Sequence, residues 1–301
     1  SDLNQATALG NSSLTADITL SAGRSINSSS SITTTGTVTM VAGEGSHAGN
    51  ITTAKEIYTP TIKALEFDGT PIDGDSGKLN LGNPIQYNLT EGTIEAWINT
   101  ANAGSSYRGI VTKAGAYGLF LKDNELIAFD WIDGDIHTGV LLNDNKWHHV
   151  ALSFADNVTN GSQVYIDGKA VGPAFTFKIY DNSYSATIGG ASSGPWQDFS
   201  GKIDEVRIWN SVRSANDIAA YSTYPIPKYS TNLVGYYPLD EASGQLIDYS
   251  NSSHSVSLPT SGVKRSGAVS AGDPAASINY FSQFLGTFAN GSKTNNQDVW
   301  K

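Results

Sequence analysis

The sequence predicts an all-β protein: a two-sheet antiparallel jelly-roll sandwich with a short β-solenoid-like or extended N-terminal segment. Two observations predict this fold class. Short runs of alternating apolar and polar residues recur along the chain between turn residues, which is the pattern of half-buried strands. The 301 residues also include 31 glycines and 10 prolines, while only 15% are charged. Such a composition is typical of many short strands joined by tight turns.

Long, aromatic strands begin near residue 64. Residues 92–100 (GTIEAWINT) alternate strictly, and residues 117–133 predict a hairpin that turns at Asp123–Asn124. Asp167–Gly168 predicts the tip of a second hairpin within residues 162–172, because Asp-Gly between alternating runs favours a two-residue turn. Further strands are expected at 146–154, 185–191 and 202–210. One helix is expected at 212–222, with Ser214 as its N-cap.

The first sixty residues differ from the rest. ITLSAG (18–23) and VTMVAG (38–43) echo each other about twenty residues apart, close to one turn of a β-solenoid. The segment resembles the β-helix repeats of filamentous-haemagglutinin-type adhesins, and virion fibre shafts have similar repeats. The alternative is a flexible Ser/Thr-rich linker. We expect a β-repeat stalk at 1–62, a jelly roll at 63–259 and a docking or assembly tail at 260–301.

Composition excludes several functions. The formal charge is −10 with a pI near 4.8, which argues against nucleic acid as a partner, since phosphates require basic surface. The chain has no cysteine and therefore neither a disulfide nor a thiolate metal site. No stretch approaches the ~18–20 apolar residues of a membrane span, and we find no signal peptide, so we expect a mature chain, a fragment, or a protein made inside its host.

One carboxylate raises a question. Residues 199–210 read FSGKIDEVRIWN, and regular alternation places Asp204 on the same face as Val206 and Ile208. That face should be the core face, where a lone carboxylate is costly unless a cation or hydrogen-bond donors meet it.

Six short motifs occur in the order typical of laminin-G-like, concanavalin-A-like jelly-roll modules, a group that includes the pentraxins. They are FDG (67–69), GTIEAWI, WHHVAL, VYIDGKAVG, ATIGG and GKIDEVRIWN. The resemblance implies two antiparallel sheets packed face to face. It also implies binding of glycans or protein partners at a cell or virion surface, frequently with bound calcium.

The resemblance implies that the Asp of FDG and the Asp of IDEV lie close together on adjoining strands. Asp68 and Asp204 would then share a structural calcium, with Asp73 or Asp75 as further ligands, because calcium takes six to eight oxygens. The alternative is that Asp204 accepts backbone N–H groups or pairs with an arginine.

Residues 232–258 depart from the family's order. They resemble the stretch that usually opens such modules, but here they follow the module. The stretch either packs back as closing strands or begins a second module, and we expect it to pack back. Aromatic residues after 279 are too dense for a disordered tail, and we expect them to dock on the body or on a partner chain.

Aromatic residues near loops suggest a glycan site. Tyr107, Trp131 and Trp196 could stack on sugar rings, while Asp133, Asp135 and Gln197 could bind the hydroxyl groups. The alternative is that these aromatics are structural.

We expect no catalysis. No strand carries the Glu-x-Asp-x-Glu pattern that would place paired carboxylates on one face for glycoside hydrolysis. Two hypotheses remain: a non-catalytic adhesion module that binds a glycan or surface protein, or a structural subunit of a filament or virion appendage. In the second, the terminal segments join neighbouring copies, since unpaired edge strands invite pairing.

Overall fold

The structure is a computed structural model, and the description is confined to part of the chain. The described residues are 3–5, 18–22, 26–28, 32–33, 38–42, 50–53, 57–58, 64–69, 77–101, 106–180, 182–192, 198–222, 226, 230–241, 243–266 and 288–289. The chain divides into two compact units. One comprises Ser1–Thr61 with Ser270–Lys301, and the other comprises Ile62–Val269.

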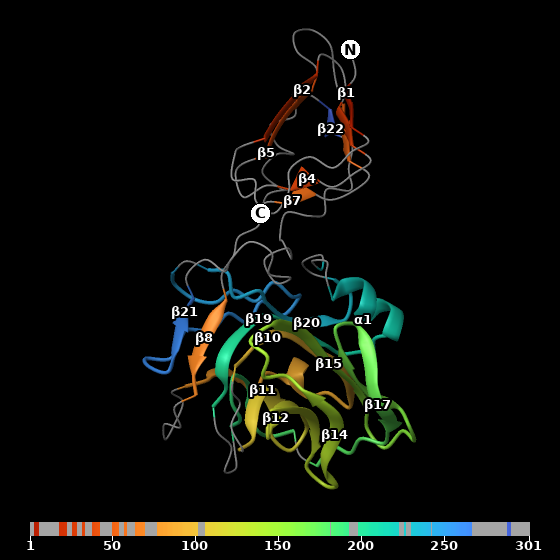
Figure 1. Ribbon diagram of the computed structural model, residues 1–301, viewed down its shortest axis with the longest axis vertical. Helices are drawn as coiled ribbons and strands as arrows, with labels where there is room; N and C mark the ends of the chain where they lie inside the picture. The colour runs from red at the N-terminus through yellow and green to blue at the C-terminus, as the bar shows by residue number, and fades with distance from the viewer. Residues whose placement is uncertain are drawn as a thin grey trace. The chain divides into compact units, whose positions relative to one another are not determined.

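The larger unit is a sandwich of two sheets, whose strands are labelled from β8 to β21 in Figure 1. The first sheet has the order β17-β16-β15-β10-β19-β8-β21, with β20 also paired to β19. Its strands are β8 (Leu65–Asp68), β10 (Glu91–Asn99), β15 (Trp147–Ala155), β16 (Ser162–Ile166), β17 (Lys169–Phe175), β19 (Ser200–Trp209), β20 (Leu233–Tyr237) and β21 (Val263–Arg265).

The second sheet has the order β14-β13-β12-β11-β18-β9. Its strands are β9 (Leu79–Gly82), β11 (Arg108–Lys113), β12 (Tyr117–Lys122), β13 (Glu125–Asp130), β14 (Gly134–Leu141) and β18 (Ala186–Ile188), and a short 3-10 helix spans Ile85–Tyr87. Every pairing in both sheets is antiparallel. This is the predicted two-sheet sandwich.

The core lies between the two sheets. Tyr117 of the second sheet stacks on Phe154 of the first, with ring centroids 5.1 Å apart. Phe67, Phe177 and Phe199 are also among its largest buried side chains. Burying a large apolar side chain stabilises a fold by about 1.5–3 kcal/mol, so this shared core accounts for the packing of the two layers.

Both predicted hairpins form as expected. Asp123 and Asn124 have φ values of 52° and 67°, while Asp167 and Gly168 have 49° and 74°. Two consecutive residues with positive φ are the signature of a type I′ turn, whose twist matches that of the strands that it joins.

The predicted alternation of β19 is wrong because a β-bulge interrupts it. Across the β10–β19 ladder, Glu95 pairs with Arg207 and Trp97 pairs with Asp204, so two residues of β19 oppose one residue of β10. The bulge lies at Glu205, which has a φ of 51°. The extra residue keeps Ile203 in the core and moves Asp204 to the outer face, opposite Trp97.

The predicted helix is α1 (Ala215–Tyr221), whose N-cap Ser214 accepts a hydrogen bond from Asp217 N. Ile218 of α1 packs on Ala151 and Tyr165, against the outer face of the first sheet. Among the described residues, no helix is long and apolar enough to cross a membrane.

Residues 232–258 pack back on the sandwich. β20 pairs antiparallel with β19, and Leu246 and Val256 form a bridge that joins the core. Nearby, β21 pairs with β8, and Ser266 exchanges hydrogen bonds with Ala64 of 2.8 and 2.9 Å. The two ends of the larger unit are therefore joined to each other.

The smaller unit contains short strands paired mostly in parallel: β1 (Leu3–Gln5), β2 (Ile18–Ala22), β3 (Ile26–Ser28), β4 (Ile32–Thr33), β5 (Val38–Ala42), β6 (Asn50–Thr53), β7 (Ile57–Tyr58) and β22 (Phe288–Ala289). ITLSA of β2 pairs in parallel with VTMVA of β5, so that Ile18 faces Val38. Likewise β1, β3 and β6 form one sheet, and β4 pairs with β7. Successive parallel strands at this spacing are the arrangement of a β-solenoid.

Candidate functional site

Four aromatic rings gather on the outer face of the second sheet; we call this group the aromatic platform. Its members are Tyr107, Phe120, Phe129 and Trp131. Alternation along β12 directs Leu119 and Leu121 into the core, and Phe120 therefore faces outward. Phe120 is fully buried beneath its neighbours, whereas the other three rings are partly exposed.

The rings of the platform pack edge to face. Phe129 lies 5.0 Å from Trp131, 5.7 Å from Tyr107 and 5.8 Å from Phe120, measured between ring centroids. Each of these pairs is T-shaped, which is a favoured geometry for aromatic side chains. The platform is therefore a rigid apolar surface held by its own contacts.

Local backbone features hold Trp131 in place. Asp130, which is fully buried, accepts hydrogen bonds from the backbone N–H groups of Ile132 and Asp133 through Oδ1 and of Lys178 through Oδ2, at 2.7–3.0 Å. Gly118 of β12 leaves room for the indole, since a Cβ there would stand 3.1 Å from Trp131 and 2.5 Å from Phe120. The turn after β13 is thereby fixed with its indole over β12.

A polar group borders the rings. Asp135 of β14 accepts hydrogen bonds from Lys122 Nζ at 2.5 Å and from the Tyr107 hydroxyl at 3.0 Å, both on Oδ2. Lys122 also donates to the Tyr107 hydroxyl and lies 4.5 Å from the centre of that ring. The hydrogen bond to Asp135, followed by that to Tyr107, raises the pKa of Lys122 well above its ordinary value.

The structure brings together only part of the predicted ligand site. Tyr107, Trp131 and Asp135 meet at the platform, whereas Asp133 extends to Lys178, with 2.7 Å between Oδ2 and Nζ. Trp196 and Gln197 lie outside the described residues. The sequence reasoning missed Phe120, Phe129 and Lys122. Their positions on the face opposite the core leucines could have revealed them.

The structure does not bring Asp68 and Asp204 together. Their strands are neighbours, as expected, but Asp68 of β8 faces Ser200 of β19. Asp204 lies four positions further along β19, a displacement of about 13 Å at the rise of a strand. Asp68 is exposed, whereas Asp204 is buried on the outer face opposite Trp97.

Asp68 and Asp204 therefore lie too far apart along β19 to share one ion. Asp73 and Asp75 lie outside the described residues, and within the described part of the chain no three acidic, His or Cys residues are grouped to hold a metal. The charge of Asp68 acts on a second carboxylate, that of Asp198. Burial raises the pKa of Asp198 to about 6, Lys78 opposes that rise, and Asp68 adds to it.

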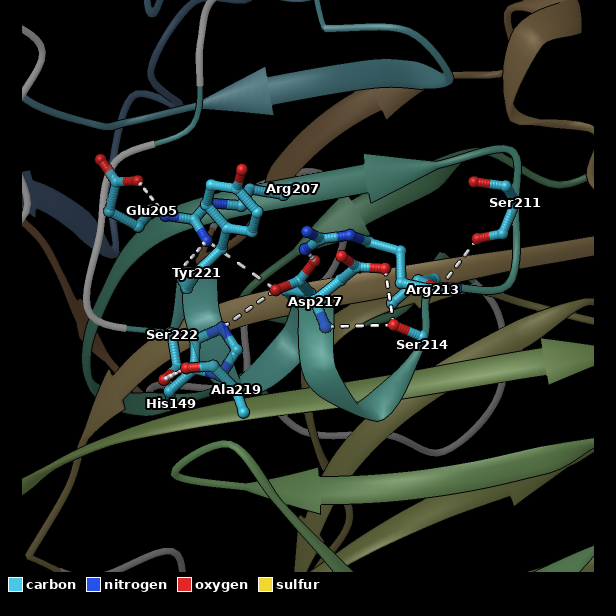
Figure 2. Close-up of polar contacts among 12 residues, drawn as sticks. His149, Glu205, Arg207, Ser211, Arg213, Ser214, Asp217, Ala219, Tyr221 and Ser222 are labelled. Atoms are coloured by element: carbon cyan, nitrogen blue, oxygen red, sulfur yellow. Dashed lines mark hydrogen bonds and ion pairs between the residues drawn. The ribbon is translucent and has the colours of Figure 1, made fainter. Parts of the chain in front are cut away.

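A second polar cluster lies buried between α1 and the outer face of the first sheet (Figure 2). Glu95 of β10 binds Arg213 at 2.6 Å, and it lies 3.2 Å from His149 and 3.8 Å from Arg207. Burial alone would raise the pKa of Glu95, but the contact with His149 and the charges of Arg213 and Arg207 lower it to about 2.

The same cluster continues across the bulge of β19. Glu205 accepts hydrogen bonds from Arg207 at 2.8 Å and from the Tyr236 hydroxyl at 3.0 Å. Arg207 also donates to the carbonyl of Tyr221 in α1 at 2.9 Å. Glu95 and Arg207 are fully buried, and the cluster pairs its carboxylates with arginines. Its geometry joins α1 to the sheet.

Residues 73–219 match a laminin-G-like family model described as the Concanavalin A-like lectin/glucanases superfamily. The matched residues lie within the sandwich, which we therefore call the laminin-G-like module. No curated protein sequence matches the chain at significant similarity.

The chain is also similar to solved structures. One, described as a candidate carbohydrate-binding protein from Bacteroides ovatus ATCC 8483, is 22% identical with a TM-score of 0.56; the match covers 69% of this chain and 60% of that one. A pentraxin from Limulus polyphemus is 13% identical with a TM-score of 0.46, covering 70% and 98%. The CBM40 of a Ruminococcus gnavus sialidase, bound to sialyllactose, is 12% identical with a TM-score of 0.41, covering 54% and 99%.

Proposed function

We propose that the laminin-G-like module is a non-catalytic glycan-binding module that acts outside the cell or at a surface. The aromatic platform carries this proposal. Partly exposed rings of Tyr107, Phe129 and Trp131 provide a surface on which the apolar face of a sugar ring can stack. Lys122 and Asp135 stand beside the rings and can orient the hydroxyl groups, because a few placed polar groups fix a ligand on an apolar surface.

Two further observations support the proposal. The family is one of lectins and glucanases, and the Bacteroides ovatus structure is described as a carbohydrate-binding candidate. Two carboxylates at the platform and its turn are paired with lysines, Asp135 with Lys122 and Asp133 with Lys178. Paired carboxylates of this kind are not arranged across a scissile bond, as glycoside hydrolysis requires. We therefore propose binding without catalysis.

A glycan array with the native protein and two variants tests the proposal. Trp131→Ala should weaken the strongest glycan signal at least about tenfold, the equivalent of about 1.4 kcal/mol, because it removes the stacking surface. Tyr180→Ala is the matched control, since Tyr180 is an aromatic residue with 73% exposure that is not part of the platform. An array on which the native protein binds nothing, or binding that Trp131→Ala leaves unchanged, would refute the proposal.

The alternative proposal is a structural subunit whose terminal segments join neighbouring copies. The parallel strands of the smaller unit favour it: in the described residues, β1 ends its sheet with β3 on one side only. Such an edge can pair with another chain. Sedimentation over a range of concentrations measures this directly, and a strictly monomeric protein would refute assembly through this edge.

A further inference from the structure

The platform has an uneven charge distribution. Six charged side chains among the described residues contact the platform or the turn that follows β13. They are Lys122, Glu125, Asp130, Asp133, Asp135 and Lys178. His137 is a further titratable group there. With His137 neutral, four carboxylates stand against two ammonium groups. The whole chain is acidic as well, with a formal charge of −10. An approaching ligand therefore meets net negative charge both nearby and at long range.

Each lysine already neutralises a carboxylate. Lys122 is bound to Asp135 at 2.5 Å and Lys178 to Asp133 at 2.7 Å. Arg108, at the start of β11, donates to the backbone carbonyls of Asp198 and Gly69 and so points elsewhere. An acidic sugar would have to share a lysine with the carboxylate that the lysine already neutralises, so neither ion pair offers it net positive charge.

The carboxylates at the platform can only accept hydrogen bonds. Glu125 already binds His137 Nδ1 at 2.8 Å and the backbone N–H of Gly139 at 2.6 Å. Asp135 uses Oδ2 for both of its hydrogen bonds, and its Oδ1 is buried without a hydrogen-bond partner among the described residues. A hydroxyl group of a ligand can donate to an exposed carboxylate such as that of Asp133, whose side chain is 54% exposed, whereas a carboxylate or sulfate group cannot.

We propose that the platform selects neutral glycans and discriminates against sialylated and sulfated ones. The inference rests on the proposed glycan-binding function and adds the ligand class. Neutral pyranose rings supply what the site can use, an apolar face for the rings and hydroxyl donors for the carboxylates. An added anionic group brings like charges together, and such juxtaposition lowers affinity for the wrong partner.

Titration with matched glycans tests this inference. The probes are a neutral galactose-terminated oligosaccharide, the same oligosaccharide capped with sialic acid, and its sulfated form. Where the neutral oligosaccharide binds, each acidic form should bind at least about tenfold more weakly at physiological salt. The difference should shrink as salt is raised, because salt screens repulsion between exposed charges.

A charge-reversal pair locates the effect. Asp133→Lys changes the charge at the platform, and the side chain of Asp133 is 54% exposed. This variant should reduce the ratio of the affinity for neutral glycans to that for acidic glycans several-fold. Asp144→Lys is the matched control, because it makes the same change of net charge at a side chain with 40% exposure, paired with Lys146 outside the platform. Asp144→Lys should leave most of this affinity ratio unchanged.

The outcomes separate the two proposals. If no glycan of any charge binds, the proposed function itself fails. If acidic glycans bind as well as neutral ones or better, the function stands and the neutral-ligand inference is overturned. The inference is equally overturned if Asp133→Lys and Asp144→Lys have the same effect, because discrimination would then come from net charge and not from the platform.

Discussion

Glu95 shows how a single buried residue links the sequence to stability. Its strand position directs it to the outer face of the first sheet, where α1 and Arg213 cover it. The side chain is fully buried, and an isolated carboxylate there would be strongly destabilising. The contacts with Arg213, His149 and Arg207 offset that cost. Breaking one partner of such a pair costs about 3–5 kcal/mol, because it leaves the other charge unpaired.

The low pKa of Glu95 predicts an acid-sensitive fold. The folded-state pKa of about 2 lies below the ordinary value of 4.5, so the ionised form is favoured in the folded protein. This stabilisation, about 3 kcal/mol, is fully present above pH 4.5 and is lost as the pH falls toward 2. Urea unfolding at pH 6 and pH 3 measures it, and the free energy of unfolding should fall with pH.

Replacing Glu95 tests whether this residue causes the pH dependence of the free energy of unfolding. Glu95→Gln should lower the free energy of unfolding by about 3 kcal/mol at pH 6 and flatten its fall between pH 5 and pH 3. Glu91→Gln is the control, because Glu91 is exposed at the start of the same strand. If Glu95→Gln keeps the acid sensitivity of the parent, another carboxylate causes it.

At the scale of elements, one inserted residue decides which side chains of β19 face the core and which face outward. The bulge at Glu205 keeps Ile203, Val206 and Ile208 in the core although their spacing is not alternate. It also turns Asp204 outward. The register of β8 against β19, in which Asp68 faces Ser200, then separates Asp204 from Asp68.

This register predicts that Asp68 and Asp204 act independently. If no ion bridges them, the effects of Asp68→Asn and Asp204→Asn on the free energy of unfolding should add in the double variant within about 0.5 kcal/mol. A chelator should lower the melting temperature of Asp204→Asn no more than that of the parent. Strong non-additivity that disappears with chelator would instead show a shared calcium.

At the scale of the whole molecule, the laminin-G-like module has the features of an independent domain. Ala64 and Ser266 exchange hydrogen bonds at its two ends, and its core lies between its own sheets. The parallel strands of the smaller unit form separate sheets. A fold with its own core is expected to be stable alone.

A shortened chain of residues 62–269 tests this independence. It should retain the near-UV circular dichroism of the packed aromatic core and a cooperative thermal transition within a few degrees of the parent's. Any self-association of the full chain should be lost with the removed segments. A chain that begins at Thr61 but keeps residues 270–301 identifies which segment matters. Unfolding of the 62–269 chain would show that the smaller unit belongs to the sandwich.

Much of this architecture follows from local sequence. Alternation predicted the strands, Asp-Asn and Asp-Gly predicted turns with positive φ, and Ser214 predicted the helix start; each is seen in the structure. These features depend on residues close together in the chain, so a short window contains their physical cause. The motif order likewise indicated the laminin-G-like module, which the family match shows.

The candidate site depends on contacts between residues that lie far apart in the sequence. Tyr107 and Trp131 could be proposed one by one from the loops beside them. Their meeting with Lys122 and Asp135, however, requires the register of four strands. The sequence by itself determined which residues form strands and turns. Only the tertiary structure decided which side chains share a face, because a one-residue bulge or a shift of register redirects every side chain beyond it.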